Sequence, residues 1–325
     1  MNRREFIALL GGTAAAPSAL WSRPLRAQPQ PRMLRLGFAG IQPRESPSYA
    51  AFLKRMAELG YQEGRNFAFE YIQTPSIYGY EKSYRELAAR KVDMFLAVGN
   101  EPALRAARAV AENRPIVFLA IDFDPQAKGY VANLSRPGGN VTGIFVGQIE
   151  LAAKRVEIAR ELFPGATVVG IAFDMVSREQ RDAAAAAART LGLEPRLIEL
   201  NEQDDYGRAF GAMADGQPIV LPASPLFVRD REVIARTLLG RRIPSIAAFR
   251  ENTEAGALIS YGFDLVGLFR DIAGYVHQIA RGAKPAGMPI EQSSRYHMAV
   301  NLKTAASLGV SLSDTFVARA NEVRE

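Results

Sequence analysis

The sequence contains no cysteine among its 325 residues, and only two histidines and one tryptophan. Without cysteine the chain can form no disulfide, offers no thiol nucleophile and carries no thiol for lipid attachment. The two histidines, His277 and His297, stand in no recognisable metal-ligand spacing. We therefore expect neither a metal site nor a cofactor.

Motifs that carry catalysis or bind phosphate are also missing. No G-x-S-x-G elbow occurs, and Ser224, in Pro222-Ala223-Ser224-Pro225, lacks the glycines that such a sharp turn requires. The G-x-x-x-x-G-K-[ST] pattern of phosphate-binding loops does not occur either. These absences predict no catalytic residue and favour a binding protein over an enzyme, with a periplasmic hydrolase or isomerase as the minor alternative.

The net charge is small, and the apolar runs are short. The net charge is +6, and residues 1–27 account for +3 of it, with four arginines against one glutamate. A remainder of this size, scattered along the chain, does not predict nucleic-acid binding. No later stretch approaches the roughly 20 apolar residues that a membrane span needs. We expect a monomer that does not bind nucleic acid and is not anchored in a membrane.

The first residues resemble a twin-arginine export signal. Residues 2–6 (NRREF) place paired arginines before a phenylalanine, and a short, mildly apolar stretch follows over residues 7–16. Residues 25–27 (LRA) offer a cleavage point, so we expect a mature periplasmic chain that begins near Gln28. The alternative, a basic amphipathic helix, is disfavoured because four prolines between residues 17 and 31 would break it.

Apolar runs alternate with helical periodicity along the rest of the chain, which is typical of βαβ units and a parallel sheet. Strands are predicted over residues 33–37, 66–73, 92–98, 115–121, 141–146, 167–173, 195–200, 218–222, 243–248 and 257–261. Helices are predicted over residues 46–59, 84–89, 150–162, 178–191, 205–214, 229–239 and 265–280, and after Pro102. We expect an α/β fold of two doubly wound, Rossmann-like lobes with a hinge and a cleft between them.

Several blocks of sequence, in order along the chain, resemble the ABC-transporter substrate-binding proteins of the tryptophan/tyrosine-binding type. They are residues 58–66 (ELGYQEGRN), 135–143 (SRPGGNVTG), 249–251 (FRE), 254–262 (EAGALISYG) and 301–305 (NLKTA). The resemblance implies a type I periplasmic binding fold, with lobe 1 formed by residues 33–145 plus about 263–289 and lobe 2 by residues 146–262 plus about 290–325. It also implies a ligand in the cleft and an ABC permease as partner.

Polar residues that follow strands of the first lobe are the first candidates for ligand contact, because ligands of open α/β sheets bind at the carboxyl ends of strands. In the resembling family, residues at the place of Asn100-Glu101-Pro102 hold a ligand carboxylate. Asn100 can donate from its amide, whereas Glu101 departs from the pattern and disfavours an anion beside it. Asp122 is a candidate partner for an ammonium group and Phe123 a candidate aromatic wall. Gln42, in the loop after the first strand, is predicted to reach the cleft.

The second lobe adds six candidates, again at strand ends. Phe173 and Phe249 are predicted to sandwich an apolar group, and Arg250 to pair with a carboxylate; the alternative for Arg250 is a tie to Glu251 or Glu254. For Tyr261 the alternatives are ligand contact and core packing, and Gly262 permits hinge torsion or close ligand approach. The remaining candidates are Asp174 and Ser224.

These observations predict a periplasmic solute-binding protein that delivers a ligand to an ABC importer. We expect the ligand to be a small polar or zwitterionic metabolite, either amino-acid-like or an aromatic acid. The acidic departures at Glu101, Asp122 and Asp174 argue against simply copying an aromatic amino acid from the resembling family, and they favour a group with a positive end or many hydroxyls. A ligand-sensing module that presents its ligand to a membrane receptor is the alternative from another class.

Overall fold

The structure is a computed structural model that describes residues 33–201 and 206–325. The predicted export signal and its cleavage point at Ala27 therefore lie outside the described residues. Within the described ranges, no helix combines the length and apolar character that crossing a bilayer requires.

The first sheet has six strands, all parallel, in the order β11-β5-β4-β3-β1-β2. Its strands are β1 (Leu34–Gly40), β2 (Phe67–Gln73), β3 (Met94–Gly99), β4 (Ile116–Ala120), β5 (Val141–Phe145) and β11 (Glu291–Gln292). Its helices are α1 (Pro47–Glu58), α2 (Tyr80–Ala89), α3 (Glu101–Ala111) and α10 (Leu265–Ala280), with short 3-10 turns η1 (Ile77–Gly79) and η4 (Pro285–Gly287). We call this sheet and its helices the first lobe.

The second sheet has seven strands in the order β13-β12-β10-β9-β8-β6-β7, and only the β10–β12 pair is antiparallel. The strands are β6 (Val168–Phe173), β7 (Glu194–Glu199), β8 (Ile219–Val220), β9 (Ser245–Ala247), β10 (Ile259–Phe263), β12 (Tyr296–Asn301) and β13 (Glu322–Arg324). The helices are α4 (Gln148–Leu162), α5 (Arg178–Thr190), α6 (Tyr206–Ala209), α7 (Pro225–Arg229), α8 (Arg231–Gly240), α9 (Arg250–Glu254), α11 (Leu302–Leu308) and α12 (Asp314–Val317), with 3-10 turns η2 (Met175–Ser177) and η3 (Phe210–Ala212). This is the second lobe.

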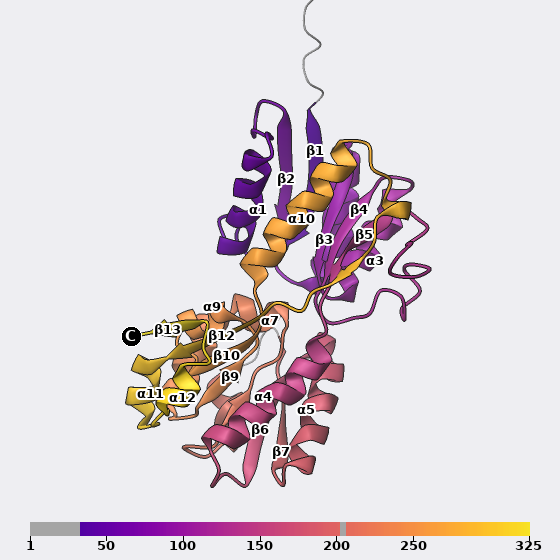
Figure 1. Ribbon diagram of the computed structural model, residues 1–325. Helices are drawn as coiled ribbons and strands as arrows, with labels where there is room; N and C mark the ends of the chain where they lie inside the picture. The colour runs from indigo at the N-terminus through magenta and orange to yellow at the C-terminus, as the bar shows by residue number, and fades with distance from the viewer. Residues whose placement is uncertain (1–32, 202–205) are drawn as a thin grey trace, which may run out of the picture. The chain divides into compact units, whose positions relative to one another are not determined.

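Helices cover both faces of each sheet, as buried parallel strands require. Every residue of β3 and β4 is buried, which explains why these segments are apolar throughout rather than alternating. In Figure 1, α10 lies across the first sheet beside α1, although more than 200 residues separate the two helices in sequence. The predicted α/β fold of two doubly wound lobes is thereby confirmed.

The chain passes between the lobes after β5, after β10 and after β11 (Figure 1). The expected return to lobe 2 at about residue 290 needs a small correction, because Glu291 still pairs with Ile144 in the first sheet. Near the first crossing, Gly143 has a φ of +153°, and a Cβ there would collide with the carbonyl of Phe118. Only glycine permits this close approach of neighbouring strands.

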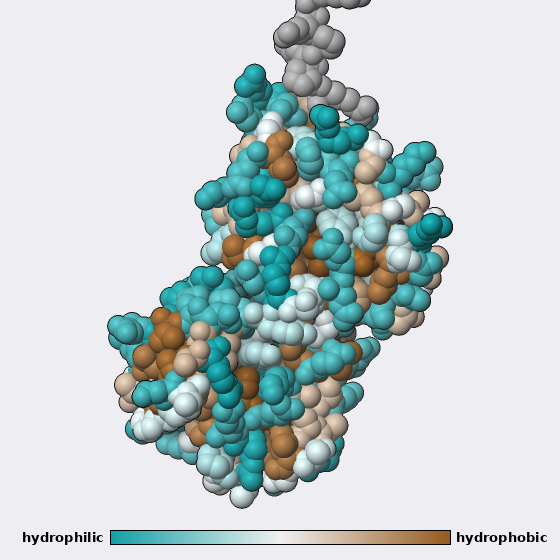
Figure 2. All heavy atoms as spheres, in the orientation of Figure 1, coloured by the Kyte–Doolittle hydropathy of each residue, from teal (hydrophilic) through white to brown (hydrophobic). Residues whose placement is uncertain are grey.

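The face of the molecule drawn in Figure 2 is largely polar. On the face drawn in Figure 2, hydrophilic residues predominate and hydrophobic residues appear in small separate groups. Single exposed apolar side chains are ordinary on protein surfaces. We therefore expect a functional site where the strand ends of the two lobes face each other.

Candidate ligand-binding site

A cavity of about 340 Å³ lies between the lobes, where the carboxyl ends of β1, β3 and β4 face those of β8 and β9. We call it the aromatic cavity. The first lobe contributes Ile41, Gln42, Pro43, Glu45, Ser46, Pro47, Ser48, Tyr49, Tyr80, Val98, Gly99, Asn100, Ile121, Leu265 and Phe269, and the second contributes Ser224, Pro225, Val228, Arg231, Phe249, Glu251 and Glu254. Its size lies in the range of small-molecule sites.

Apolar side chains form most of the wall. Tyr49 and Phe269 lie with ring centroids 5.2 Å apart, and both belong to the core of the first lobe. Phe249, at the end of β9, is 3% exposed and packs into the same cluster from the second lobe. The walls are therefore held by core packing and form a preshaped, water-poor surface.

Glu251 is the buried charge of this wall. It lies in the first turn of α9, is 8% exposed and lines the cavity. Its Oε2 atom has no hydrogen-bond partner among the described residues. Burial raises the pKa of the Glu251 carboxyl above its usual range, and the negative charge of Glu254 adds to the rise.

Asn100 and Asp122 form a pair beside the cavity in the first lobe. The Asn100 amide donates to Asp122 Oδ2, while Asn100 Oδ1 and Asp122 Oδ1 are buried without a partner in the described part of the chain. Burial raises the pKa of Asp122 to about 7, although the hydrogen bond from Asn100 opposes the rise. The negative charges of Asp174 and Glu179, both on the second lobe, also raise the pKa of Asp122. The protonation of Asp122 therefore depends on negative charge on the second lobe.

A second cavity of about 390 Å³ lies next to the first, with Ile41 and Pro225 in both walls. We call it the Asp174 cavity; its wall also includes Tyr78, Met175 and Arg229. Asp174 caps η2 by accepting from the backbone N–H of Ser177 at 3.0 Å and from its hydroxyl at 2.6 Å, and Ser224 donates to the other carboxylate oxygen. The pKa of Asp174 is nevertheless raised, because burial outweighs these hydrogen bonds.

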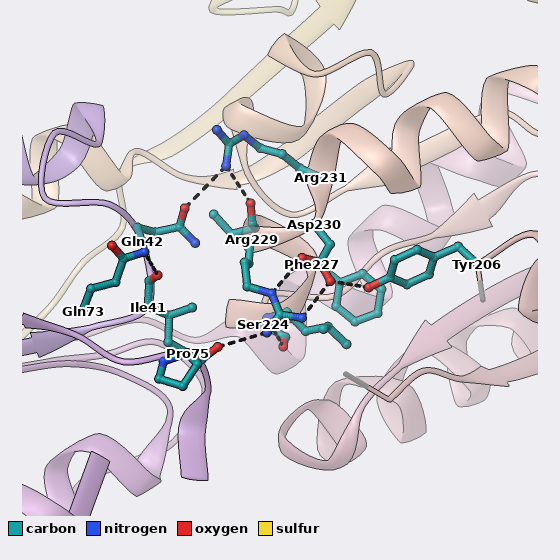
Figure 3. A network of polar contacts seen from close by, with 12 residues as sticks. Ile41, Gln42, Gln73, Pro75, Tyr206, Ser224, Phe227, Arg229, Asp230 and Arg231 are labelled. Carbon is teal, nitrogen blue, oxygen red and sulfur yellow. Dashed lines mark hydrogen bonds and ion pairs between the residues drawn. The ribbon is translucent and has the colours of Figure 1, made fainter. Parts of the chain in front are cut away.

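Several polar contacts between described residues join the two lobes around these cavities. In Figure 3, the guanidinium of Arg229, on the second lobe, donates to the carbonyl of Pro75 at 3.1 Å. The carboxylate of Asp230 accepts from the same guanidinium. Arg231 donates to Gln42 Oε1 at 3.4 Å. Tyr78 Oη donates to the sulfur of Met175 at 3.7 Å, and Lys128 Nζ lies 3.6 Å from Glu179.

Four of the eleven predicted ligand-contact residues line the aromatic cavity: Gln42, Asn100, Ser224 and Phe249. Asp174 lines the neighbouring cavity, and Asp122 lies behind Asn100. Ligand contact by these residues remains a prediction.

The other five have structural partners. Glu101 accepts from the hydroxyl of Tyr130 at 2.9 Å, and the ring of Phe123 packs edge-on against Tyr130. Phe173 is buried under the guanidinium of Arg181, whose carbon lies 4.7 Å from the ring centroid.

Arg250 pairs with Glu254 at 2.9 Å, as its alternative interpretation held, and lies 3.5 Å from Glu322. Tyr261 stacks on Tyr296, in agreement with the packing interpretation. A Cβ at position 262 would collide with the carbonyl of Ala248, so Gly262 permits close packing against the neighbouring strand.

The cavity also contains Glu251, Tyr49 and Arg231, which were not predicted from the sequence. Glu251 directly follows the predicted candidates Phe249 and Arg250, and its position after β9 could have indicated it. Tyr49 lies on the apolar face of α1 and looked like a core residue, which it also is.

Comparisons with known proteins agree with this geometry. The model of the family described as "ABC transporter substrate binding protein" matches residues 44–324. A tyrosine-binding protein of Clostridioides difficile is 22% identical over 262 residues, which cover 79% of this chain and 75% of that protein.

Two solved structures share the fold. A conserved domain protein of Vibrio cholerae has a TM-score of 0.81 at 22% identity, with 90% of this chain and 100% of that chain covered. The ABC domain of a Streptococcus pneumoniae protein in complex with L-Trp has a TM-score of 0.76 at 20% identity, with 89% and 99% covered.

Proposed function

The chain belongs to the family of ABC transporter substrate binding proteins, and from this premise we propose that it captures a small polar or zwitterionic metabolite, amino-acid-like or an aromatic acid, in the aromatic cavity. The observation that carries the proposal is the enclosure of this cavity by strand ends of both lobes. A ligand held there would be trapped when the lobes close and released when they open. The ligands named for the tyrosine-binding and L-Trp-bound relatives support an amino-acid-like solute.

Gln42, Asn100, Ser224 and Phe249 are the proposed ligand contacts among the predicted residues. Gln42 and Asn100 belong to the first lobe and the other two to the second. A ligand that touches both sets gains contacts only in the closed form, and this differential affinity is what shifts the equilibrium toward closure.

A thermal-shift screen tests the proposal. The panel contains amino acids, aromatic acids, polyamines, sugars and polyols, each at millimolar concentration, and native mass spectrometry of protein purified without denaturation identifies any retained ligand. We expect at least one compound to raise the melting temperature, since a ligand at 100 times its Kd contributes about 2.7 kcal/mol. A panel without any shift would contradict capture of a small metabolite.

We further propose export through the twin-arginine route, a monomeric mature chain and delivery to an inner-membrane permease. Replacing Arg3 and Arg4 by lysine should retain the precursor in the cytoplasm, and N-terminal sequencing of the periplasmic form should start near Gln28. Pull-down with ligand present should recover permease subunits; recovery of a receptor ectodomain instead would favour the sensing module.

A further inference from the structure

Arg155, on α4, carries a positive charge that is completely buried, with an exposed fraction of 0%. Its Nε donates to the carbonyl of Leu151 at 3.2 Å and its Nη2 donates to Gln148 Oε1 at 2.8 Å. The Nη1 atom has no hydrogen-bond partner in residues 33–201 and 206–325. Burial lowers the pKa of the Arg155 guanidinium only to about 9, so the side chain keeps its charge at pH 7.

Gln148, the first residue of α4, forms a pair with Arg155 and is itself 1% exposed. Because a guanidinium has only donors, the amide must present its oxygen to Arg155, which leaves the Nε2 atom of Gln148 free. That nitrogen also has no partner among the described residues. The two unpartnered nitrogens belong to groups joined by one hydrogen bond of 2.8 Å, so they are parts of one local set of donors.

No acid in the described part of the chain neutralises this guanidinium. Burial alone shifts the pKa of Arg155, and no described carboxylate opposes the shift, including the exposed Glu150 in the first turn of α4. By contrast, Arg319 pairs with Glu161, near the other end of α4, at 2.7 Å on the surface. A buried charge without a counter-ion is strongly destabilising, which favours an anion taken up from solution.

The start of α4 favours an anion for a second reason. The helix has 15 residues, and its N-cap residue, Gly147, has no side chain that could accept from the first backbone N–H groups. The helix macrodipole makes this end positive. Since the guanidinium of Arg155 hydrogen-bonds to Gln148 and Leu151, at the same end of the helix, two sources of positive potential coincide there.

The burial of both residues limits the kind of anion. Arg155 supplies one positive charge, which matches a monovalent ion, and side chains that are 0% and 1% exposed disfavour a bulky polyatomic acid. The walls of the aromatic cavity and of the Asp174 cavity contain neither Arg155 nor Gln148. The anion is therefore distinct from the ligand proposed for the aromatic cavity.

We propose that Arg155 and Gln148 bind one small monovalent anion, with the size and charge of chloride, inside the second lobe at the start of α4. The helix begins where the chain has just crossed between the lobes. Beside it, the backbone N–H of Ser293, on the last crossing, donates to the carbonyl of Phe145, on the first, at 3.1 Å. The anion stabilises the second lobe by neutralising the buried guanidinium, and this site does not depend on the proposed function.

Bromide locates the site directly, because it replaces chloride and scatters X-rays anomalously. In crystals of the purified protein soaked in sodium bromide, we expect an anomalous peak within hydrogen-bond distance of Arg155 Nη1 and Gln148 Nε2. A solvent peak without anomalous signal at this position would show a buried water and overturn the assignment. Bromide at exposed side chains only, as adventitious ions, would overturn it too.

Thermal unfolding measures the effect in solution. The chloride gain is the melting temperature in sodium chloride minus that in sodium gluconate, a larger anion, at equal ionic strength. The matched variants are Arg155→Met and Lys154→Met, since Lys154 is the neighbouring residue on α4 and pairs with Glu157 on the exposed face. We expect Arg155→Met to reduce the gain by at least about 2 °C and Lys154→Met to change it by less than about 0.5 °C, because general salt effects are common to all three proteins.

Gln148→Leu provides a second variant that keeps the guanidinium and removes one donor. We expect the midpoint of a chloride titration to rise about tenfold in this variant, because a hydrogen bond to a charged group is lost. An unchanged midpoint in Gln148→Leu, or an unchanged chloride gain in folded Arg155→Met, would overturn the assignment. Both results leave the proposed function intact, since the metabolite screen reads a different cavity.

Discussion

The two neighbouring cavities each contain a buried carboxylate, and the surroundings of these carboxylates differ. Asp174 accepts hydrogen bonds from Ser177 and Ser224 at both of its oxygens. Glu251 is buried to a similar extent, yet its Oε2 has no partner in the part of the chain that the structure describes. A satisfied buried carboxylate contributes to the fold, whereas an unsatisfied one costs stability unless something else supplies its partner.

Two cavities of similar volume therefore have walls of different chemistry. The wall of the Asp174 cavity includes capping contacts and the lobe-joining residues Tyr78, Met175 and Arg229. The wall of the aromatic cavity is mostly apolar, with unpartnered acceptors. Volume alone does not distinguish a structural space from a ligand site, but the hydrogen-bond state of the buried polar atoms does.

The largest effect is expected for Asp174→Ala, which removes the carboxylate that caps η2 and receives the Ser224 hydroxyl. We expect the free energy of unfolding to fall by about 3 kcal/mol, because several charge-assisted hydrogen bonds are lost and their donors stay buried. Urea denaturation measures it, and Asp182→Ala, an exposed aspartate on α5, is the control. A loss below about 1 kcal/mol would mean that the carboxylate of Asp174, like that of Glu251, contributes little to the stability of the fold.

Glu251→Gln is expected to have the opposite sign in the unliganded protein. The substitution removes a buried charge, one oxygen of which has no partner among the described residues, and keeps the shape, so we expect stability at pH 7 to rise by about 1 kcal/mol. Since the folded pKa of Glu251 is raised, the wild type binds more protons folded than unfolded, and its stability should fall as pH rises through that pKa.

Thermal unfolding between pH 4 and pH 8 measures this difference, with Glu161→Gln as the control of equal charge. The wild type and the control should lose stability with rising pH more steeply than Glu251→Gln. A Glu251→Gln variant less stable than the wild type at pH 7 would show that the carboxylate supports the fold.

The sequence predicted the fold well, because its strongest signals are local. The apolar runs that became β3 and β4 are buried on both faces, and helix periodicity marked α1 and α10. Short elements were missed for the same reason: α9 spans five residues, too few for a periodic pattern.

The sequence predicted cavity-lining residues only where the sheet topology determines their position. Asn100, Ser224 and Phe249 directly follow or lie close after strands, and parallel strands bring their carboxyl ends to one edge. Sequence position does not reveal which way a side chain points. Arg250 and Glu251 are neighbours on α9, yet Arg250 turns to Glu254 and Glu322 while Glu251 lines the cavity.

Asp122 is a third buried carboxyl group, and only one of its oxygens has a hydrogen-bond partner among the described residues, the amide of Asn100. Its pKa is about 7 with the lobes in contact, and the negative charges of Asp174, Glu179 and Glu101 contribute to the rise. Opening would admit water and move Asp174 and Glu179 away, which lowers the pKa. Closure thus takes up a proton, and the closed form should lose stability relative to the open form as pH rises through 7.

We expect the closed-to-open ratio to fall by up to about tenfold between pH 6 and pH 8 in the wild type and to stay nearly constant in Asp122→Asn. Fluorescence transfer between dyes on Arg85→Cys in α2 and Arg189→Cys in α5 measures the ratio, and labelling is specific because the chain has no cysteine of its own. The same pH dependence in wild type and Asp122→Asn would exclude this carboxyl as its source.

The smallest effect is expected at the exposed contact between the lobes, where Lys128 lies 3.6 Å from Glu179 and 3.7 Å from Glu101. Its side chain is 39% exposed, so water and salt screen both pairs. Lys128→Gln should change the free energy of unfolding by less than about 0.5 kcal/mol, and the difference should vanish in 0.5 M salt. A larger, salt-resistant effect would mean that this exposed ion pair contributes to stability as a buried contact does.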